Sequence, residues 1–238
     1  METITPIVTT SRSSFFEAAE QSGDALIVLR EANPPSIDEL KAYCSKLGGI
    51  CNFEPSADVR TVKYDPTVVN STAMSLDALP LHTDGSFLKH PPRRFLLSFL
   101  SKDADGGGVS TFMPISKILT SAPEWVLQAC LNASFRFVKT YDGNLDDSFV
   151  GPILEREGGQ MRIRWRSDSI WRPKVVAAQG TRAAAAVDWM HDFLSISEPF
   201  KYAADTGETL LMSNTSMLHG RTRLSSNSTR VVLRVWLS

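Results

Sequence analysis

The chain has 238 residues, of which 42% are hydrophobic and 21% are charged, as in an ordinary globular protein. Its formal net charge of −1 produces no field that attracts nucleic acid or an anionic membrane, so we expect neither as a partner. The three cysteines form no CxxC pair, which argues against a disulfide framework and a structural zinc site. The apolar runs are too short to span a bilayer, and the first residues lack a signal-peptide pattern. We therefore predict a cytoplasmic protein with a small-molecule substrate.

The first part of the chain shows the pattern strand, turn, helix. Residues 25–29 are a short apolar run typical of a buried strand, and Pro34 and Pro35 interrupt the chain after it. Ser36 and Glu39 have the spacing of a capping box, which predicts a helix that continues to Gly48.

The rest of the chain alternates predicted strands with two predicted helices. The expected strands are residues 59–64, 79–84, 94–99, 109–113, 134–139, 210–214 and 229–237, and the expected helices are 118–131 and 175–194. In the first of these helices, Trp125, Val126 and Cys130 are predicted on the buried side. There are no repeats or linkers, so we predict one domain over residues 1–238. Many strands and few helices favour a mainly β fold with flanking helices, built on a jelly-roll or double-stranded β-helix core.

His82, Thr83 and Asp84 end one of the predicted strands. Because successive side chains of a strand alternate faces, His82 and Asp84 should point to the same side. If the fold brings His219 alongside, two imidazoles and one carboxylate lie on one face of a metal. This set suits Fe(II), with open positions left for a cosubstrate and O2. A His-x-Asp triplet alone is weak evidence, so the prediction depends on the distal histidine and on the next feature.

The last predicted strand carries two arginines on one face. Arg230 and Arg234 share that face with Val232 and Trp236. Burying two guanidinium groups is costly without anions, so we expect carboxylates against this face. Arg230 lies eleven residues after His219, where a fixed cation could hold a dicarboxylic cosubstrate. The alternative is an edge strand with two arginines facing solvent.

Four motifs together resemble a known family. They are LHTDGSF at residues 81–87, a Gly-Gly-x-Ser element at 107–110, NTSMLHGR at 214–221 and RVVLR at 230–234. This combination resembles the Fe(II)/2-oxoglutarate-dependent dioxygenases of the taurine dioxygenase and clavaminate synthase group. The resemblance covers most of the chain, although residues 135–200 contribute little to it.

The resemblance implies a role for each matching residue. His82, Asp84 and His219 would bind iron, and Arg230 would pair with the distal carboxylate of 2-oxoglutarate. Ser110 stands where the family commonly has a threonine that contacts the same carboxylate, although Thr111 adjoins it and either hydroxyl could serve. Arg234 stands where relatives contact the substrate or the near end of the cosubstrate.

The resemblance also implies the reaction. A C–H bond would be oxidised by hydroxylation, desaturation or cyclisation, with release of succinate and CO2. The carboxylate of Asp84 argues against halogenation, because related halogenases have a small residue at this position. By analogy, the substrate would be small and acidic or derived from an amino acid, as in natural product biosynthesis.

Residues of the substrate pocket are harder to predict. Phe87 follows the metal motif directly, and Arg162, Arg164 and Arg166 alternate along a possible strand, where they could recognise an anionic group. A solvated strand face is the alternative for the three arginines. Asn214 could form a hydrogen bond near His219 or simply stabilise a turn.

Two other functional classes remain open. One is a jelly-roll binding protein with a vestigial metal site, and the other is a metal-dependent hydrolase that uses the same ligands. Neither has an obvious role for Arg230 and Arg234, so the oxygenase is the preferred interpretation. The sequence leaves open whether the chain acts as a monomer or a homo-oligomer.

Overall fold

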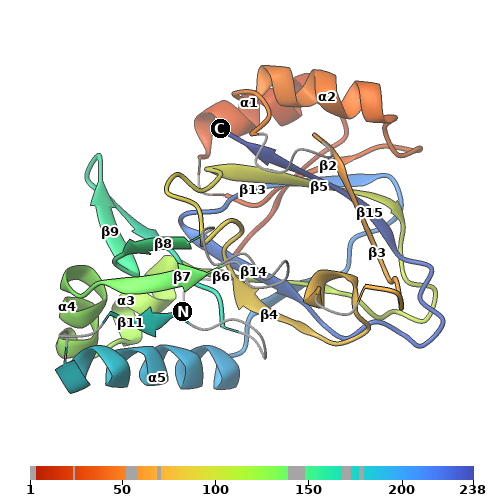
Figure 1. Ribbon diagram of the computed structural model, residues 1–238. Coiled ribbons are helices and arrows are strands. Elements are labelled where there is room, and N and C mark those ends of the chain that lie inside the picture. The colour runs from red at the N-terminus through yellow and green to blue at the C-terminus, as the bar shows by residue number, and fades with distance from the viewer. Residues whose placement is uncertain are drawn as a thin grey trace.

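The computed structural model describes residues 4–23, 25–51, 58–68, 71–138, 148–167, 173–176 and 180–238. It is mainly β, with two sheets that face each other and helices on their outer sides (Figure 1). The larger sheet has the order β1 (Ile7–Thr9), β2 (Ile27–Arg30), β13 (Glu208–Ser213), β5 (Arg94–Ser101), β15 (Val231–Leu237) and β3 (Arg60–Lys63). The smaller sheet has the order β12 (Phe200–Tyr202), β6 (Ser110–Pro114), β14 (Met217–Arg221) and β4 (Leu79–His82).

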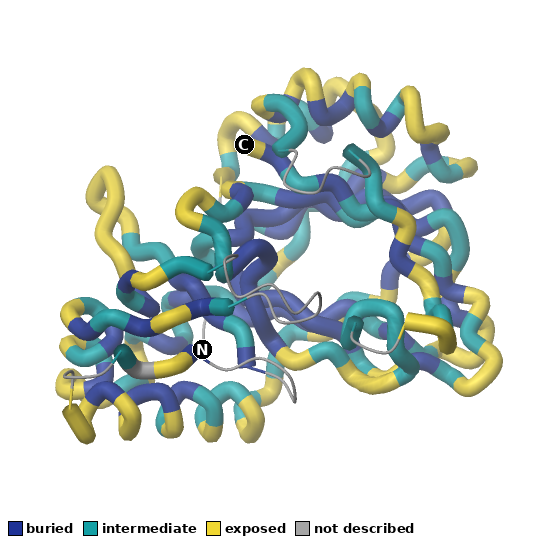
Figure 2. Tube along the Cα trace, viewed as in Figure 1, coloured by how far each residue is buried: buried dark blue, intermediate teal, exposed yellow. Residues whose placement is uncertain are grey.

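Alternating side chains of the two sheets form the interior. Phe95 and Val232 of the larger sheet lie in one buried apolar cluster with Phe112 of the smaller sheet. The opposite faces of the same strands pack outward: Leu233 and Val235 belong to a second cluster, which includes residues of the first two helices. Figure 2 shows that the buried residues are concentrated in both sheets.

Helices α1 (Arg12–Gln21) and α2 (Ile37–Lys46) cover the outer face of the larger sheet (Figure 1). The predicted capping box is confirmed: Glu39 N donates to Ser36 Oγ at 3.2 Å, and Ser36 N donates to Glu39 Oε2 at 2.9 Å. Both bonds satisfy amide groups that have no partner within the helix. Helix α1 was not predicted, although Ser11 caps it and Phe15 and Ala19 form its buried side.

A second group of elements packs against the outer face of the smaller sheet. Its apolar cluster joins Leu81, Met113 and Leu218 to the helices. This group consists of α3 (Ile115–Ser121), α4 (Glu124–Asn132), α5 (Gly180–Ile196), a sheet of β11 (Lys174–Val175), β7 (Phe135–Val138) and β8 (Ser148–Gly151), and the hairpin β9 (Leu154–Glu157) and β10 (Gln160–Ile163). A short 3-10 helix, η1 (Thr72–Met74), precedes β4.

The predicted strands are confirmed with shifted ends, whereas the predicted helices 118–131 and 175–194 need correction. The expected helix 118–131 is two helices, because Pro123 disfavours helical backbone before it and ends α3. Trp125, expected on the buried side, is 39% exposed, whereas Val126 and Cys130 are buried. The expected helix 175–194 starts only at Gly180, since Val175 pairs with Phe135 as part of β11; residues 177–179 lie outside the described ranges.

Two strand ends near the predicted site also differ from expectation. Strand β4 stops at His82, so Asp84 lies in the turn that follows it. Strand β15 begins at Val231, so Arg230 lies just before the strand, and its pairing with β5 shifts register between Val231 and Val232. Within the described ranges, none of the helices has the length and apolar character needed to cross a membrane.

Candidate metal centre

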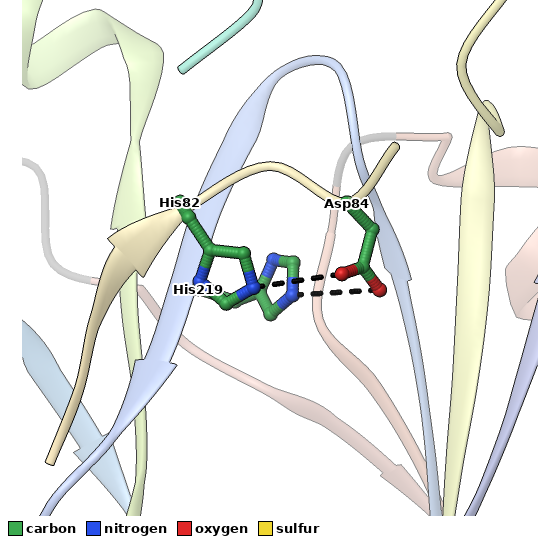
Figure 3. A group of neighbouring side chains, drawn as sticks. All are labelled: His82, Asp84 and His219. Atoms are coloured by element: carbon green, nitrogen blue, oxygen red, sulfur yellow. Dashed lines mark ion pairs between the residues drawn. The ribbon is translucent and has the colours of Figure 1, made fainter. Parts of the chain in front are cut away.

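Two neighbouring strands and one turn bring the predicted metal ligands together. In the pairing of β14 with β4, His219 lies directly opposite His82, and their ring centroids are 4.2 Å apart. Although Asp84 lies beyond the strand, its carboxylate turns back toward both rings (Figure 3). Its Oδ1 is 3.5 Å from His82 Nε2, and its Oδ2 is 3.9 Å from His219 Nε2. The ligand atoms all lie within 4.8 Å of one another, and the three residues are buried.

A hydrogen bond orients the His82 ring toward the carboxylate. His82 Nδ1 lies 2.9 Å from the carbonyl oxygen of Pro80, and a carbonyl can only accept, so the proton is on Nδ1. In a neutral ring with this proton, the lone pair is on Nε2, the atom that faces Asp84. Burial, followed by repulsion from His82, lowers the pKa of His219 well below its usual value, so this ring is neutral.

The Nε2 atoms of both histidines and the Asp84 carboxylate converge on one space, where each can donate an electron pair to a cation. A metal ion about 2 Å from each ligand atom fits the observed separations of the nitrogens from the carboxylate. Two imidazoles and one carboxylate are also the donor set typical of Fe(II) sites with open positions. Among the described residues, this is the one cluster of three such side chains that could hold a metal.

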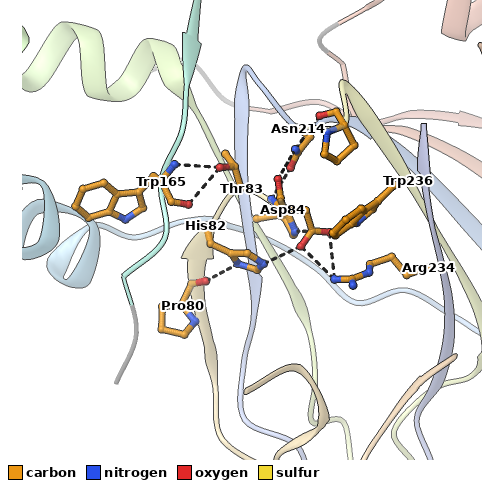
Figure 4. A network of polar contacts seen from close by, with 10 residues as sticks. Pro80, His82, Thr83, Asp84, Trp165, Asn214, Arg234 and Trp236 are labelled. Atoms are coloured by element: carbon orange, nitrogen blue, oxygen red, sulfur yellow. Dashed lines mark hydrogen bonds and ion pairs between the residues drawn. The ribbon is translucent and has the colours of Figure 1, made fainter. Parts of the chain in front are cut away.

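The carboxylate of Asp84 also accepts hydrogen bonds from the terminal strand (Figure 4). Arg234 Nη1 donates to Oδ1 at 3.1 Å and to Oδ2 at 3.2 Å, and Trp236 Nε1 donates to Oδ2 at 2.7 Å. Burial raises the pKa of Asp84, but the charge of Arg234 and the contacts with the histidines outweigh it. The pKa therefore lies well below its ordinary value, and the carboxylate is ionised.

The backbone of the metal motif is held from two sides. The amide side chain of Asn214 accepts from Asp84 N at 2.7 Å and donates to the carbonyl oxygens of Asp84 and Pro92, both at 2.9 Å. On the other side, Thr83 N donates to Trp165 O at 2.7 Å, and Trp165 N donates to Thr83 Oγ1 at 3.0 Å. Asn214 therefore fixes the Asp84 backbone rather than a group near His219.

Arg230 is buried between the sheets, with 6% of its surface exposed. Its guanidinium carbon lies 5.1 Å from the centre of the Phe99 ring, and a Cβ at Gly108 would come within 2.7 Å of Arg230 Cδ. Burial, followed by repulsion from Arg221, lowers the pKa of Arg230 to about 10, so it stays charged at neutral pH. Within the part of the chain that the structure describes, Arg230 forms no ion pair and its Nε has no hydrogen-bond partner.

The two hydroxyls considered for the cosubstrate point in opposite directions. Phe112 lies in the cluster between the sheets, whereas Met113 lies in the outer cluster with the second group of helices. By alternation along β6, Ser110 faces the interior with Phe112, and Thr111 faces outward. Thr111 Oγ1 would lie only 2.9 Å from a Cβ at Gly220, in agreement with that direction.

Arg164 has a structural contact network. It is 8% exposed, so the alternative of a solvated face is wrong for this residue. Its guanidinium donates to the carbonyl oxygens of Ser86 at 2.7 Å, of Leu88, and of Lys89 at 3.3 Å, and lies over the Phe149 ring. Arg164 thus holds the loop after the metal motif, which includes the half-buried Phe87. A substrate contact of Phe87 or Arg164 stays a prediction.

Two residues near the site were missed in the sequence. Trp236 contacts the carboxylate of Asp84, and Arg221 donates to the carbonyl oxygens of Asp77 at 2.7 Å and Ser75 at 2.6 Å in the segment before β4. Each lies two positions from a predicted site residue, Arg234 or His219. The period of a strand was therefore a signal for both.

A model of the Taurine catabolism dioxygenase TauD, TfdA family matches residues 11–236. The chain belongs to this family. As a member, it is an iron- and 2-oxoglutarate-dependent dioxygenase, with Fe(II) and 2-oxoglutarate as the groups that its centre uses. Among curated proteins, none matches the sequence.

Three solved structures illustrate the fold that this chain shares with known proteins. An asparagine oxygenase in complex with Fe(II), 3-hydroxyasparagine and succinate has a TM-score of 0.72 at 20% identity, over 94% of this chain and 77% of that one. The non-heme iron oxygenase OrfP, with Fe, succinate and dihydroxy-L-Arg, has a TM-score of 0.74 at 17% identity, over 95% and 80%. PvcB from Pseudomonas aeruginosa has a TM-score of 0.68 at 19% identity, over 94% and 79%. At these identities the similarity shows a shared fold.

Proposed function

We propose that residues 1–238 form a single dioxygenase domain with a double-stranded β-helix (jelly-roll) core, and that His82, Asp84 and His219 bind its iron. The two facing sheets with helices outside support the jelly roll. The two Nε2 atoms that face one buried carboxylate support the ligand assignment.

Arg230 is the proposed anchor of 2-oxoglutarate, with Ser110 as a second donor to the distal carboxylate. The observation that carries this proposal is a charged guanidinium, buried between the sheets, without an ion pair to any residue that the structure describes. Such burial costs several kcal/mol unless an anion compensates it. A carboxylate of the cosubstrate would provide this compensation through paired hydrogen bonds.

Iron with bound 2-oxoglutarate supplies the activation of O2, with succinate and CO2 as products. The residues of this chain orient the two cosubstrates and keep bulk water from the buried centre. The oxidised group would be a C–H bond of the substrate, in a hydroxylation, desaturation or cyclisation. The Asp84 carboxylate disfavours halogenation, and neither a metal-dependent hydrolase nor a binding protein with a vestigial site would have a role for Arg230.

The proposed substrate is a small acid or an amino-acid derivative, in a setting such as natural product biosynthesis. The compounds bound to the asparagine oxygenase and to OrfP are hydroxylated amino acids, which supports this class. Arg234 adds a cation beside the metal ligands, where it could attract a substrate carboxylate.

The test is an anaerobic titration of the protein with Fe(II) and 2-oxoglutarate. We expect a weak visible charge-transfer band from 2-oxoglutarate on iron, and no band with His219→Ala. Absence of the band in the wild type would refute the proposed function. Succinate formation, followed across amino acids and small metabolite acids with oxygen present, would then identify the substrate.

A further inference from the structure

The terminal strand contributes a neutral hydrogen-bond donor to the metal-binding carboxylate. Trp236 and Arg234 lie on the interior face of β15, and both reach Asp84 (Figure 4). The bond from Trp236 Nε1 to Oδ2, at 2.7 Å, is the shortest of the three that this carboxylate accepts from side chains of the strand. Trp236 was not among the residues expected at the site.

The two oxygens of Asp84 have different surroundings. Oδ2 receives both Trp236 and Arg234, whereas Oδ1 receives Arg234 alone. Oδ1 is also the oxygen with the shorter separation from a histidine nitrogen, at 3.5 Å against 3.9 Å for Oδ2. Since each carboxylate oxygen has about two lone-pair sites, Oδ2 is filled and Oδ1 has one site left for a metal.

Which oxygens bind the metal determines how many positions stay open. A carboxylate that binds through both oxygens occupies two positions, whereas one that binds through a single oxygen leaves three positions for 2-oxoglutarate and O2. The carboxylate torsion of an aspartate is soft, so the side chain does not choose by itself. Asn214 fixes the backbone of Asp84. The rotation of the carboxylate about its own torsion must therefore be restrained by other side chains.

We propose that Trp236 is a positioning residue that makes Asp84 bind iron through Oδ1 alone. The inference rests on the proposed iron site. The indole suits the role because it is a donor only and has no charge to neutralise the ligand. Its ring is held by the apolar cluster between the sheets and by the guanidinium of Arg234, whose carbon lies 5.0 Å from the ring.

Two substitutions separate the hydrogen bond from the volume of the ring. Trp236→Phe keeps an aromatic ring and removes the N–H group. Trp236→His restores it, because Nε2–H of a flipped imidazole overlays the indole Nε1–H. The matched control is Trp189→Phe, which removes an indole that stacks on Phe193 in the outer helical group, away from the metal ligands.

The measurements are the Fe(II) dissociation constant and the charge-transfer band with 2-oxoglutarate, both without O2. In Trp236→Phe we expect Fe(II) affinity to fall by about 10-fold or more, as for other groups that orient metal ligands, with a weaker or shifted band. Trp236→His should recover most of both properties, and Trp189→Phe should match the wild type.

Several results would overturn the inference. Wild-type affinity and band in Trp236→Phe would mean that the indole only packs, and equal losses in Trp236→Phe and Trp236→His would mean that ring volume matters instead. A wild type without the band would instead refute the proposed function.

A measurement on the wild type covers the case in which Trp236→Phe does not fold. In a ¹H–¹⁵N spectrum with Zn(II), the Trp236 indole signal, identified by its absence in Trp236→His, should lie downfield and exchange slowly. A signal typical of a solvent-exposed indole would overturn the inference.

Discussion

Arg164 and Arg230 are both buried arginines with a pKa lowered to about 10 by burial, yet their surroundings differ. The guanidinium of Arg164 is occupied by three backbone carbonyls and the Phe149 ring, as that of Arg221 is occupied by the segment before β4. That of Arg230 has no such bonds to the described residues. Burial and charge therefore do not distinguish an arginine that stabilises the fold from one that binds a ligand. The hydrogen-bond partners that the protein itself provides do distinguish them.

Arg221→Met should have the largest effect on stability. It removes the guanidinium that donates to the part-buried carbonyl oxygens of Ser75 and Asp77 and to that of Thr72. We expect the free energy of unfolding to fall by about 3 kcal/mol or more, measured by urea denaturation. A loss below about 1 kcal/mol would show that water replaces the guanidinium without cost.

Arg164→Met should destabilise the protein by about 2 kcal/mol, because it leaves the carbonyls of Ser86 and Leu88 without their donor. The loop after Asp84 should also exchange its amide hydrogens faster. Unchanged exchange in this loop would contradict the role assigned to Arg164.

Asp103 is an acid whose charge raises the pKa of Arg230, and its replacement tests whether it is the counter-ion of that arginine. Burial raises the pKa of Asp103, but hydrogen bonds from Ser225, Ser228 and Asp105 outweigh it, so the folded pKa lies below 3.8. The stability from these bonds is fully present above the unfolded pKa and is lost as pH falls toward the folded one. Asp103→Asn should cost about 1 kcal/mol above pH 5, and this difference should shrink below about pH 4 in urea titrations.

The same variant should leave the affinity for 2-oxoglutarate nearly unchanged. A large gain or loss of that affinity would mean that Asp103 is coupled to Arg230 more directly than its bonds to Ser225 indicate.

Arg230→Met should lose the least stability of these variants: without ligands, we expect the free energy of unfolding to stay the same or to rise. Replacement of a buried unpaired charge by an apolar side chain of similar length is often neutral or stabilising. Thermal unfolding without ligands, compared with Arg164→Met, is the measurement. A loss as large as that of Arg164→Met would show that Arg230 is also a scaffold residue.

Local sequence signals predicted the parts of the fold that depend on local contacts. The capping box at Ser36 could be predicted because its two partners lie three residues apart. The metal triplet at His82 could be predicted because its two ligands are spaced by the period of a strand. Pro123 also indicated a break in the helix, but the helical spacing of apolar residues around it led to the prediction of one continuous helix. The start of α5 could not be predicted, because Val175 pairs in a sheet with Phe135, which is distant in the sequence.

The contacts around the metal ligands depended on pairings that the sequence does not specify. The bond from Trp236 to Asp84 spans 152 positions, and that from Asn214 spans 130. The direction of Arg164 depends on its hydrogen bonds to the loop after Asp84. An alternating arginine pattern was therefore equally compatible with an anion site and with the network of carbonyls that the structure shows.

The most direct test of the account is a titration of Fe(II)-loaded protein with 2-oxoglutarate, comparing Arg230→Met with Arg164→Met by the charge-transfer band. We expect Arg230→Met to weaken the binding of 2-oxoglutarate by ~100-fold, as when one partner of a buried charge pair is removed. The affinity for Fe(II) should be unchanged. Folded Arg164→Met should stay within about threefold of the wild type. Wild-type affinity in Arg230→Met, or equal weakening in both variants, would contradict the assignment of Arg230 as the cosubstrate anchor.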